Sequence, residues 1–180
     1  EVGPTFADHQ HETQPRDFAG AGGLHYTNRT GRNDIVACHV ARDAHTVYFH
    51  VRTRDALTAS SDPDWMVLLL DSDQNARTGR LGYDYRVNHL RLTPGLSSIE
   101  RWNGNAWEHA GTARMEVGTN ELHLAAERAV LDMTAEKPVR FDFKWTDNVP
   151  ADAHGMDFLD QGDTAPNARF NYRYSAVSDA

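Results

Sequence analysis

The sequence has little cysteine, little lysine and no long apolar run. Its single cysteine, Cys38, excludes both an intrachain disulfide and a thiolate metal cluster. The only lysines are Lys137 and Lys144. The longest apolar run, residues 65–70, is far shorter than the ~20 residues that a membrane helix needs, so no membrane partner is expected. A net charge of −8 argues against a nucleic-acid partner, because affinity for the phosphate backbone comes from clustered Lys and Arg.

Length and composition indicate a globular protein. A chain of 180 residues with 39% hydrophobic side chains can bury a substantial core, and we expect a single domain over residues 1–180. The sequence begins at Glu1 without a Met or a targeting segment, as a mature product or an excised domain would. Residues 1–33 are rich in Gly, His, Asp and Pro and are predicted to be mostly irregular, with one short strand around Leu24–Thr27.

From residue 34 onward, short runs of alternating apolar and polar residues predict strands. Residues 36–40 and 47–51 alternate on either side of a turn, which indicates an antiparallel hairpin with one face on the core. The apolar run 65–71 indicates a central strand covered on both faces. Asn103-Gly104, between β-prone residues, predicts a second hairpin. Helical spacing is found only at residues 126–133, which predicts one or two helical turns there.

These patterns predict the fold class. Further short strands are expected at residues 83–87, 115–117, 121–126, 139–145 and 170–174. Nine or ten strands with a turn about every ten residues, one short helix and no alternation of strands with helices indicate an all-β protein. We therefore expect a two-sheet antiparallel β-sandwich of the jelly-roll or immunoglobulin-like kind.

Three oxygen-bearing side chains follow the central strand at alternate positions: Asp71, Asp73 and Asn75. This spacing converges oxygens on one point, as Ca²⁺ requires, so these residues are candidate ligands of a structural calcium ion. The resemblance to an EF-hand loop ends there, since the sixth and twelfth positions lack the Gly and Glu, and the site would have to recruit Asp84 or more distant oxygens. The alternative is a polar turn in which the same side chains bind backbone amides.

Nothing in the sequence indicates catalysis. A glycosidase needs two carboxyls facing each other at ~5 to 9 Å, whereas Asp71 and Asp73 are neighbours on one strand end. The ten histidines form no H-E-x-x-H motif, and His39, His50 and His123 are interpreted as strand-surface positions. No G-x-S-x-G or P-loop motif is present, so we expect a protein that is not an enzyme.

Aromatic and polar residues near the C-terminus suggest a sugar site. "FKWTDN" carries Lys144 and Trp145, and Asp157 follows in the next polar segment. Neutral sugars are bound in this way, with an aromatic ring against their C–H surface and fixed polar groups on their hydroxyls. Trp65 and Tyr83, on either side of the Asp71 segment, complete the candidate set.

The tryptophans also have a structural interpretation. Any of the four can be a core residue or one half of a cross-strand pair. Trp102 and Trp107 flank the Asn103-Gly104 turn, and for these two we favour the cross-strand pair. For Trp65 and Trp145 both interpretations stay open.

Five segments taken in order resemble a known family: "ARDAHTVYFHVRT", "DWMVLLLDSDQNARTGRLGYDYRVN", "LHLAAERAVL", "FDFKWTDN" and "MDFLDQGDTAPNARFNYRY". Together they resemble the family 9 carbohydrate-binding modules and the wider DOMON-like sandwich superfamily, over about residues 34–174. The resemblance implies a non-catalytic sandwich with structural calcium, in which two aromatics clamp a sugar. Trp65 lies near the position of the first aromatic, Lys144 at that of a polar ligand, and Asp157 and Phe158 near that of the second aromatic.

The sequence thus predicts a secreted accessory module, extracellular or periplasmic, that targets an attached glycoside hydrolase or polysaccharide lyase to a poly- or oligosaccharide. The expected sugar-binding residues are Trp65, Tyr83, Lys144, Trp145 and Asp157. Two alternatives remain. The domain can be a structural support without a ligand of its own, or it can bind haem non-covalently, as some DOMON-like proteins do, with an iron ligand among Met66, Met156 and Lys144.

Overall fold

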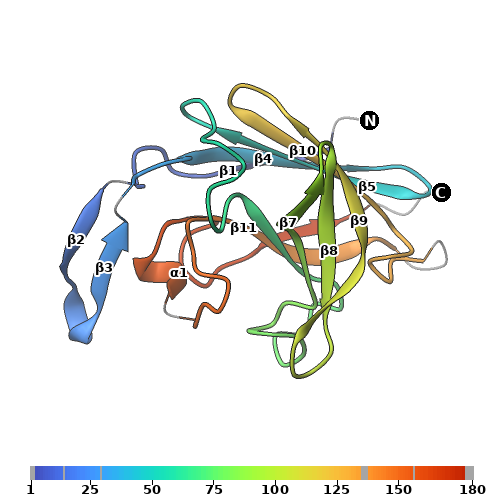
Figure 1. Ribbon diagram of the computed structural model, residues 1–180. Coiled ribbons are helices and arrows are strands. Elements are labelled where there is room, and N and C mark those ends of the chain that lie inside the picture. The colour runs from blue at the N-terminus through green and yellow to red at the C-terminus, as the bar shows by residue number, and fades with distance from the viewer. Residues whose placement is uncertain (1–2, 14, 29, 135–137, 156, 177–180) are drawn as a thin grey trace.

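The computed structural model describes residues 3–13, 15–28, 30–134, 138–155 and 157–176 and contains thirteen strands, a short 3₁₀ helix and a short α-helix. In chain order the elements are β1 (Thr5–Ala7), β2 (Arg16–Ala19), η1 (Ala21–Gly23), β3 (His25–Asn28), β4 (Ile35–Arg42), β5 (Thr46–Thr53), β6 (Val67–Asp71), β7 (Tyr85–Thr93), β8 (Leu96–Trp102), β9 (Trp107–Val117), β10 (Glu121–Glu127), β11 (Arg140–Asp147), α1 (Asp157–Asp160), β12 (Asp163–Ala165) and β13 (Tyr172–Ser175). The all-β prediction is confirmed (Figure 1).

Eleven strands form one antiparallel sheet, and it curls so that its two halves face each other. The strand order is β1-β4-β5-β10-β9-β8-β7-β6-β11-β12, and β13 also pairs with β11. Phe49 of β5 and Phe141 of β11 meet across the core with ring centroids 5.7 Å apart. The sandwich is confirmed in this form, with its two layers belonging to one continuous sheet rather than to two separate ones. In Figure 1, β4, β5 and β10 make up the upper layer.

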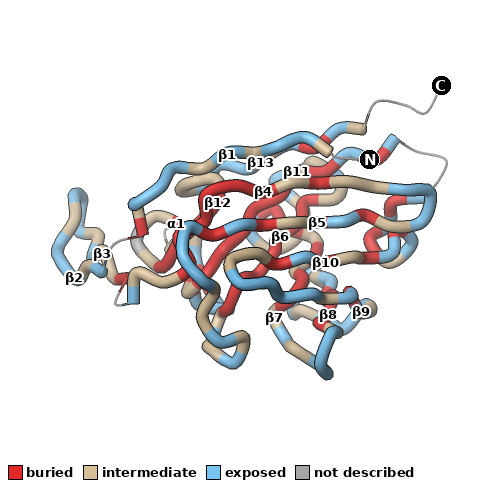
Figure 2. The backbone as a smooth tube through the Cα atoms, turned by 90° about the horizontal axis from the view of Figure 1, so that it is seen from above, coloured by how far each residue is buried: buried red, intermediate tan, exposed pale blue. Residues whose placement is uncertain are grey.

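The core lies between the two layers. It is built by every second side chain of each strand, because successive side chains in a strand point to opposite faces of the sheet. The upper layer contributes Cys38, Val40, Val47, Phe49, Val51, Leu122, Leu124 and Ala126, all with at most 1% of their surface exposed. Figure 2 shows the buried segments running through β4, β6 and β11, while the β2–β3 hairpin is mostly exposed. The removal of these side chains from water is the main stabilising contribution.

The two ends of the curled sheet meet through side chains. The hydroxyl of Tyr172 on β13 donates a hydrogen bond to the carbonyl of Ala7 on β1 at 2.9 Å. The rings of Phe6 and Tyr172 pack with centroids 5.1 Å apart. Nearby, the backbone N–H of Ile35 on β4 donates to a carboxylate oxygen of Asp163 on β12 at 2.8 Å. The first and last strands of the sheet therefore cover each other.

The N-terminal segment contains more structure than predicted. β3 coincides with the expected strand, but β1 joins the main sheet beside β4 and β2 pairs with β3 in a separate hairpin. β1 and β2 span three and four residues, which is too short for an alternating pattern to register. In Figure 1 the β2–β3 hairpin stands away from the main sheet on the side of α1. An isolated β-bridge between Thr27 of β3 and Gln161, the residue after α1, connects the hairpin to the rest of the protein.

The prediction of helical turns at residues 126–133 is wrong, because the structure has no helix there. Residues 128–132 form turns closed by short-range bonds, from Val130 N–H to Glu127 C=O and from Leu131 N–H to Arg128 C=O. The buried guanidinium of Arg128 donates to the carbonyls of Met133 and Thr134 and holds these turns in place. A helix of one or two turns has little stability of its own, so these tertiary bonds decide the local structure.

The hairpin at Asn103-Gly104 is confirmed. It joins β8 to β9, and Gly104 takes the positive φ of +100° that the turn requires. Trp102 and Trp107 are directly opposite each other on the two strands and pack edge to face with ring centroids 5.4 Å apart. Their predicted role as a cross-strand pair is also confirmed.

Candidate functional site

The two tryptophans predicted to bind a sugar lie in the core. Trp65 and Trp145 are both 0% exposed, and the Trp65 indole N–H donates to the carbonyl of Thr58 at 3.2 Å. A ring without exposed surface cannot stack on a ligand, so the prediction of a sugar contact is wrong for both residues, and with it the place of Trp65 in the clamp. The reason is physical: an indole is among the largest apolar groups in the chain, and it stabilises the fold most when the two sheet layers enclose it.

Tyr83 is also buried, and Asp157 is the one predicted sugar-binding residue that keeps an exposed part. The Tyr83 hydroxyl donates to the side-chain oxygen of Asn171 at 2.7 Å, and its ring packs edge to face on Phe158. A cavity of about 40 Å³ beside these rings has room for a few waters rather than for a sugar. The carboxylate of Asp157 accepts a hydrogen bond from the backbone N–H of His154, at the start of α1.

Lys144 is enclosed as completely as the tryptophans, at 0% exposure. Its ammonium donates to the carbonyl of Pro166, and burial lowers its pKa to about 7 although Asp8 and Asp163 lie nearby. Its predicted role as a sugar ligand at the surface is therefore wrong. Met66 is buried in the core too, so both side chains would have to leave the core to reach a haem iron, and Met156 lies outside the described residues.

The acidic loop brings three carboxylates together. Asp71, Asp73 and Asp84 each place a carboxylate oxygen within 4.8 Å of the other two, so Asp84 joins the pair as the calcium hypothesis required. Burial raises the pKa of Asp71 to about 6, and the charges of Asp84 and Asp73 add to this shift. The backbone N–H of Asn75 donates to Asp71 and to Asp73, at 3.0 and 2.9 Å, while the Asn75 side-chain oxygen accepts from the N–H of Arg77. The loop is thus a polar turn and also a convergent set of oxygens.

Gly79 fixes the shape of this loop. Its φ is +65°, and a Cβ atom there would lie 2.2 Å from the carbonyl oxygen of Tyr83. Just before it, the Thr78 hydroxyl donates to the carboxylate of Asp73 at 3.0 Å. The Thr-Gly pair therefore holds Asp73 in place beside Asp71 and Asp84.

A larger recess lies elsewhere, on the outward face of β4, β5, β10 and β9, and we call it the sheet groove. Its volume is about 540 Å³, within the range of small-molecule sites. Strand register places Ala41, Tyr48, Ala125 and Arg114 in one row across the four strands. The small alanines on both sides of Tyr48 leave its ring standing above its neighbours.

Tyr48 has an exposed ring that is held in place. Tyr48 has 37% of its surface exposed, and its hydroxyl donates to the carboxylate of Asp43 at 2.7 Å. The other oxygen of Asp43 accepts the backbone N–H groups of His45 and Thr46, and these bonds, with that from Tyr48, lower the pKa of Asp43 to about 2. The turn between β4 and β5 thereby orients the ring of Tyr48.

A row of histidines crosses the same groove. His39, His50 and His123 are paired in register on β4, β5 and β10, and Glu116 follows on β9. The rings of His39 and His50 stack with centroids 5.1 Å apart, and those of His50 and His123 with centroids 4.4 Å apart. Their interpretation as strand-surface positions is confirmed, but their assembly into a cluster was not predicted.

A signal for this cluster was present in the sequence. The predicted hairpin turns at residues 43–46, which places His39 opposite His50 and Ala41 opposite Tyr48. Motif searches follow spacing along one strand or helix and do not register this cross-strand pairing. His123 comes from a strand more than seventy residues further on, and only the folded sheet brings it to His50.

No protein-family model, curated protein or solved structure matches this chain. In the part of the chain that the structure describes, no helix has the length and apolar character to cross a membrane.

Proposed function

We propose that this domain is a non-catalytic carbohydrate-binding module whose ligand lies in the sheet groove. The observation that supports the proposal is the exposed, oriented ring of Tyr48 in a groove of about 540 Å³. An aromatic face of this kind stacks on the C–H surface of a sugar ring. Ala41 and Ala125, its neighbours in the row, leave room for that sugar on both sides.

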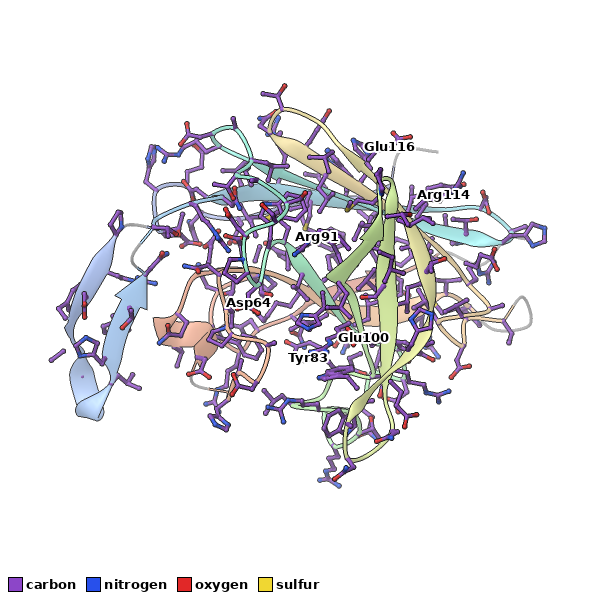
Figure 3. All side chains as sticks on the ribbon, viewed as in Figure 1. Asp64, Tyr83, Arg91, Glu100, Arg114 and Glu116 are labelled. Atoms are coloured by element: carbon purple, nitrogen blue, oxygen red, sulfur yellow. The ribbon has the colours of Figure 1, made fainter. Side chains whose placement is uncertain are left out.

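Polar side chains around Tyr48 suit sugar hydroxyls. Arg114 completes the row on β9, and Glu116 follows two residues later on the same face of the strand. Figure 3 shows both side chains at the upper end of β9. A guanidinium supplies donors in a fixed planar array and a carboxylate supplies acceptors, and together they bind adjacent hydroxyls.

The shape and charge of the groove favour a short neutral chain. Four strands with three intervals of about 4.8 Å give it a width of about 14 Å across the sheet. Arg114 is balanced by Glu116, so the groove does not have the concentrated charge that an anionic polymer would need. A neutral oligosaccharide segment, lying across the strands, fits these conditions.

We propose in addition that the acidic loop holds a structural calcium ion. Asp71, Asp73 and Asp84 would hold it, because Ca²⁺ prefers carboxylate oxygens and the charges of three close carboxylates need compensation. The ion would supply that compensation. Asn75, which the sequence also predicts to be a calcium ligand, stays a candidate through its side-chain oxygen.

The biological role follows from binding alone. A module attached to a polysaccharide-degrading enzyme raises the effective concentration of that enzyme at its substrate. We therefore propose a secreted protein, extracellular or periplasmic, in which this domain accompanies a glycoside hydrolase or a polysaccharide lyase.

The test is affinity gel electrophoresis against a panel of soluble polysaccharides, followed by titration of the glycan that retards the protein. We expect Tyr48→Ala to weaken binding on the order of tenfold or more, and Tyr48→Phe, which keeps the ring, to bind within a few-fold of the original protein. Phe170→Ala is the matched control, because Phe170 is an aromatic residue 75% exposed outside the groove.

Three results would overturn the proposal or a part of it. Equal glycan affinity in the original protein and in Tyr48→Ala would remove the groove as the site. Retardation by none of the glycans would favour the alternative of a structural support domain, and the burial of Trp65 and Trp145 agrees with that alternative. Polysaccharide cleavage by this chain alone would overturn its assignment as a non-enzyme.

A further inference from the structure

Two imidazoles and a carboxylate converge at one end of the histidine row. The Nε2 atom of His50 lies 3.1 Å from one carboxylate oxygen of Glu121, and the Nε2 atom of His123 lies 3.9 Å from the other. One ligand atom from each of the three residues lies within 4.8 Å of the other two. We infer that His50, Glu121 and His123 form a binding site for a divalent transition-metal ion, with zinc as the representative ion.

The donor set determines the class of metal. Two imidazole nitrogens and one carboxylate are ligands that Zn²⁺ accepts in three-ligand sites, with a fourth position left for water. Imidazole also suits Cu²⁺ and Ni²⁺, whereas Ca²⁺ and Mg²⁺ prefer oxygen donors only. The site is therefore chemically distinct from the acidic loop of Asp71, Asp73 and Asp84.

A second contact supports the role of His50 as a ligand. Its Nδ1 atom lies 3.0 Å from the Nδ1 atom of His39, so one of these two rings donates to the other. Without a metal ion the His50 Nε2–H donates to the Glu121 carboxylate, and Nδ1 accepts from His39. A metal ion at Nε2 would take the place of that proton, and His50 would then donate through Nδ1 to His39. A metal-binding histidine characteristically donates its other ring N–H to a neighbouring acceptor, and this bond orients the ring.

The arrangement can close on an ion with a small movement. His50 is partly buried and held by His39, whereas His123 is exposed. The rings of His50 and His123 are stacked at an interplanar angle of 22°, so the two planes that contain their nitrogen lone pairs are nearly parallel. Rotation of the exposed His123 ring about χ2, a soft torsion, would turn its Nε2 atom toward the point between His50 and Glu121.

The metal site and the proposed sugar platform use different residues. Tyr48, Arg114 and their alanine neighbours form one row of the groove, and His50 and His123 belong to the next row. The inference therefore does not depend on the proposed function, and either can fail without the other.

The test is calorimetric titration of the metal-free protein with ZnCl₂, repeated with Co²⁺ to record its visible absorption. We expect one saturable ion per chain in this site. Glu121→Gln and His123→Gln should each weaken zinc binding on the order of tenfold or more. The matched controls are Glu127→Gln, an exposed carboxylate on the same strand, and His109→Gln, an exposed histidine on β9, and both should bind zinc as the original protein does.

Circular dichroism and thermal unfolding of each variant establish that it is folded before its affinity is compared. Tyr48→Ala should keep the zinc affinity of the original protein, which separates this result from the glycan test. The inference is wrong if the original protein shows no saturable zinc binding. It is equally wrong if the double variant His50→Gln/His123→Gln binds zinc with unchanged affinity, because the ion would then occupy a different site.

Discussion

The side chains of Tyr48 and His50, two residues apart on β5, project from the same face of the sheet, and both line the sheet groove. Val47, Phe49 and Val51, the residues that alternate with them, point into the core and are at most 1% exposed. One strand thus anchors the fold with one face and presents an aromatic ring and an imidazole with the other. Substitutions on the outward face are expected to change binding with little effect on folding, and inward substitutions are expected to do the opposite.

Trp145→Ala is expected to destabilise the protein by about 3 to 5 kcal/mol, because it empties a large, fully buried site between the sheet layers. Urea denaturation measures the change in the free energy of unfolding, with unfolding followed by far-UV circular dichroism because the substitution removes a tryptophan fluorophore. Any loss of glycan binding in this variant should track the unfolded fraction. A Trp145→Ala protein with the stability of the original and no glycan binding would contradict the burial of the ring.

Lys144→Met is expected to flatten the pH dependence of stability in the alkaline range. The pKa of Lys144 falls from 10.5 to about 7 on folding, so the unfolded chain binds the extra proton between these values. The original protein should therefore lose stability relative to Lys144→Met as the pH falls from about 10.5 to 7. Denaturation midpoints measured across this range test the sign, and a constant difference between the two proteins would show that Lys144 is solvated.

Asp71→Asn tests the proposed calcium ion through the stability of the protein. Folding raises the pKa of Asp71 from 3.8 to about 6, so the stabilisation that protonation gives is present below pH 3.8 and is lost as the pH rises through 6. In chelator, the original protein should lose stability relative to Asp71→Asn over this range.

Calcium at pH 7.5 should reverse that order, since an ion that binds only the folded state adds to its stability. Thermal unfolding with calcium and with chelator supplies the measurement. If calcium up to millimolar concentrations does not change the stability of the original protein, the calcium proposal is wrong and the acidic loop is only a polar turn.

Glu100→Gln is expected to cost about 3 kcal/mol or more of stability. Glu100 on β8 binds the guanidinium of Arg86 on β7 through two bonds of 2.7 and 2.9 Å, and both side chains are largely buried. Arg86 also lies 5.0 Å over the ring of Trp107, so its charge stays enclosed when the partner is neutralised. Chemical denaturation gives the value, with Glu127→Gln as the exposed control, and a change below about 0.5 kcal/mol in Glu100→Gln would contradict the prediction.

Alternation along the sequence was sufficient to predict the strands that form the core. Residues 36–40 and 47–51 became β4 and β5, and the run 65–71 became β6, because each pattern was long enough to separate a buried face from an exposed one. The three-residue strand β1 was too short for this. The turns at residues 128–132 depend on Arg128, whose hydrogen bonds to Met133 and Thr134 form only in the folded chain.

The candidate site was harder to predict than the fold. Composition identifies aromatic residues but does not distinguish a buried ring from an exposed one, and Trp65, Trp145 and Tyr83 all proved to be buried. The proximity of the acidic side chains was easier to predict, since Asp71 and Asp73 are close in sequence and Asp84 directly precedes the adjacent strand β7. Tyr48, His50 and His123 meet through strand register, which is a property of the sheet rather than of any local motif.

The contact between Tyr172 and Ala7 has a consequence for the protein at high local concentration. A free strand edge exposes unpaired N–H and C=O groups, and two such edges can join neighbouring molecules into a continuous sheet. Here β1, at one end of the strand order, and β13, which pairs with β11 near the other end, shield each other within one molecule. These two edges are therefore expected to be less available for pairing with strands of neighbouring molecules, even where many copies are crowded together.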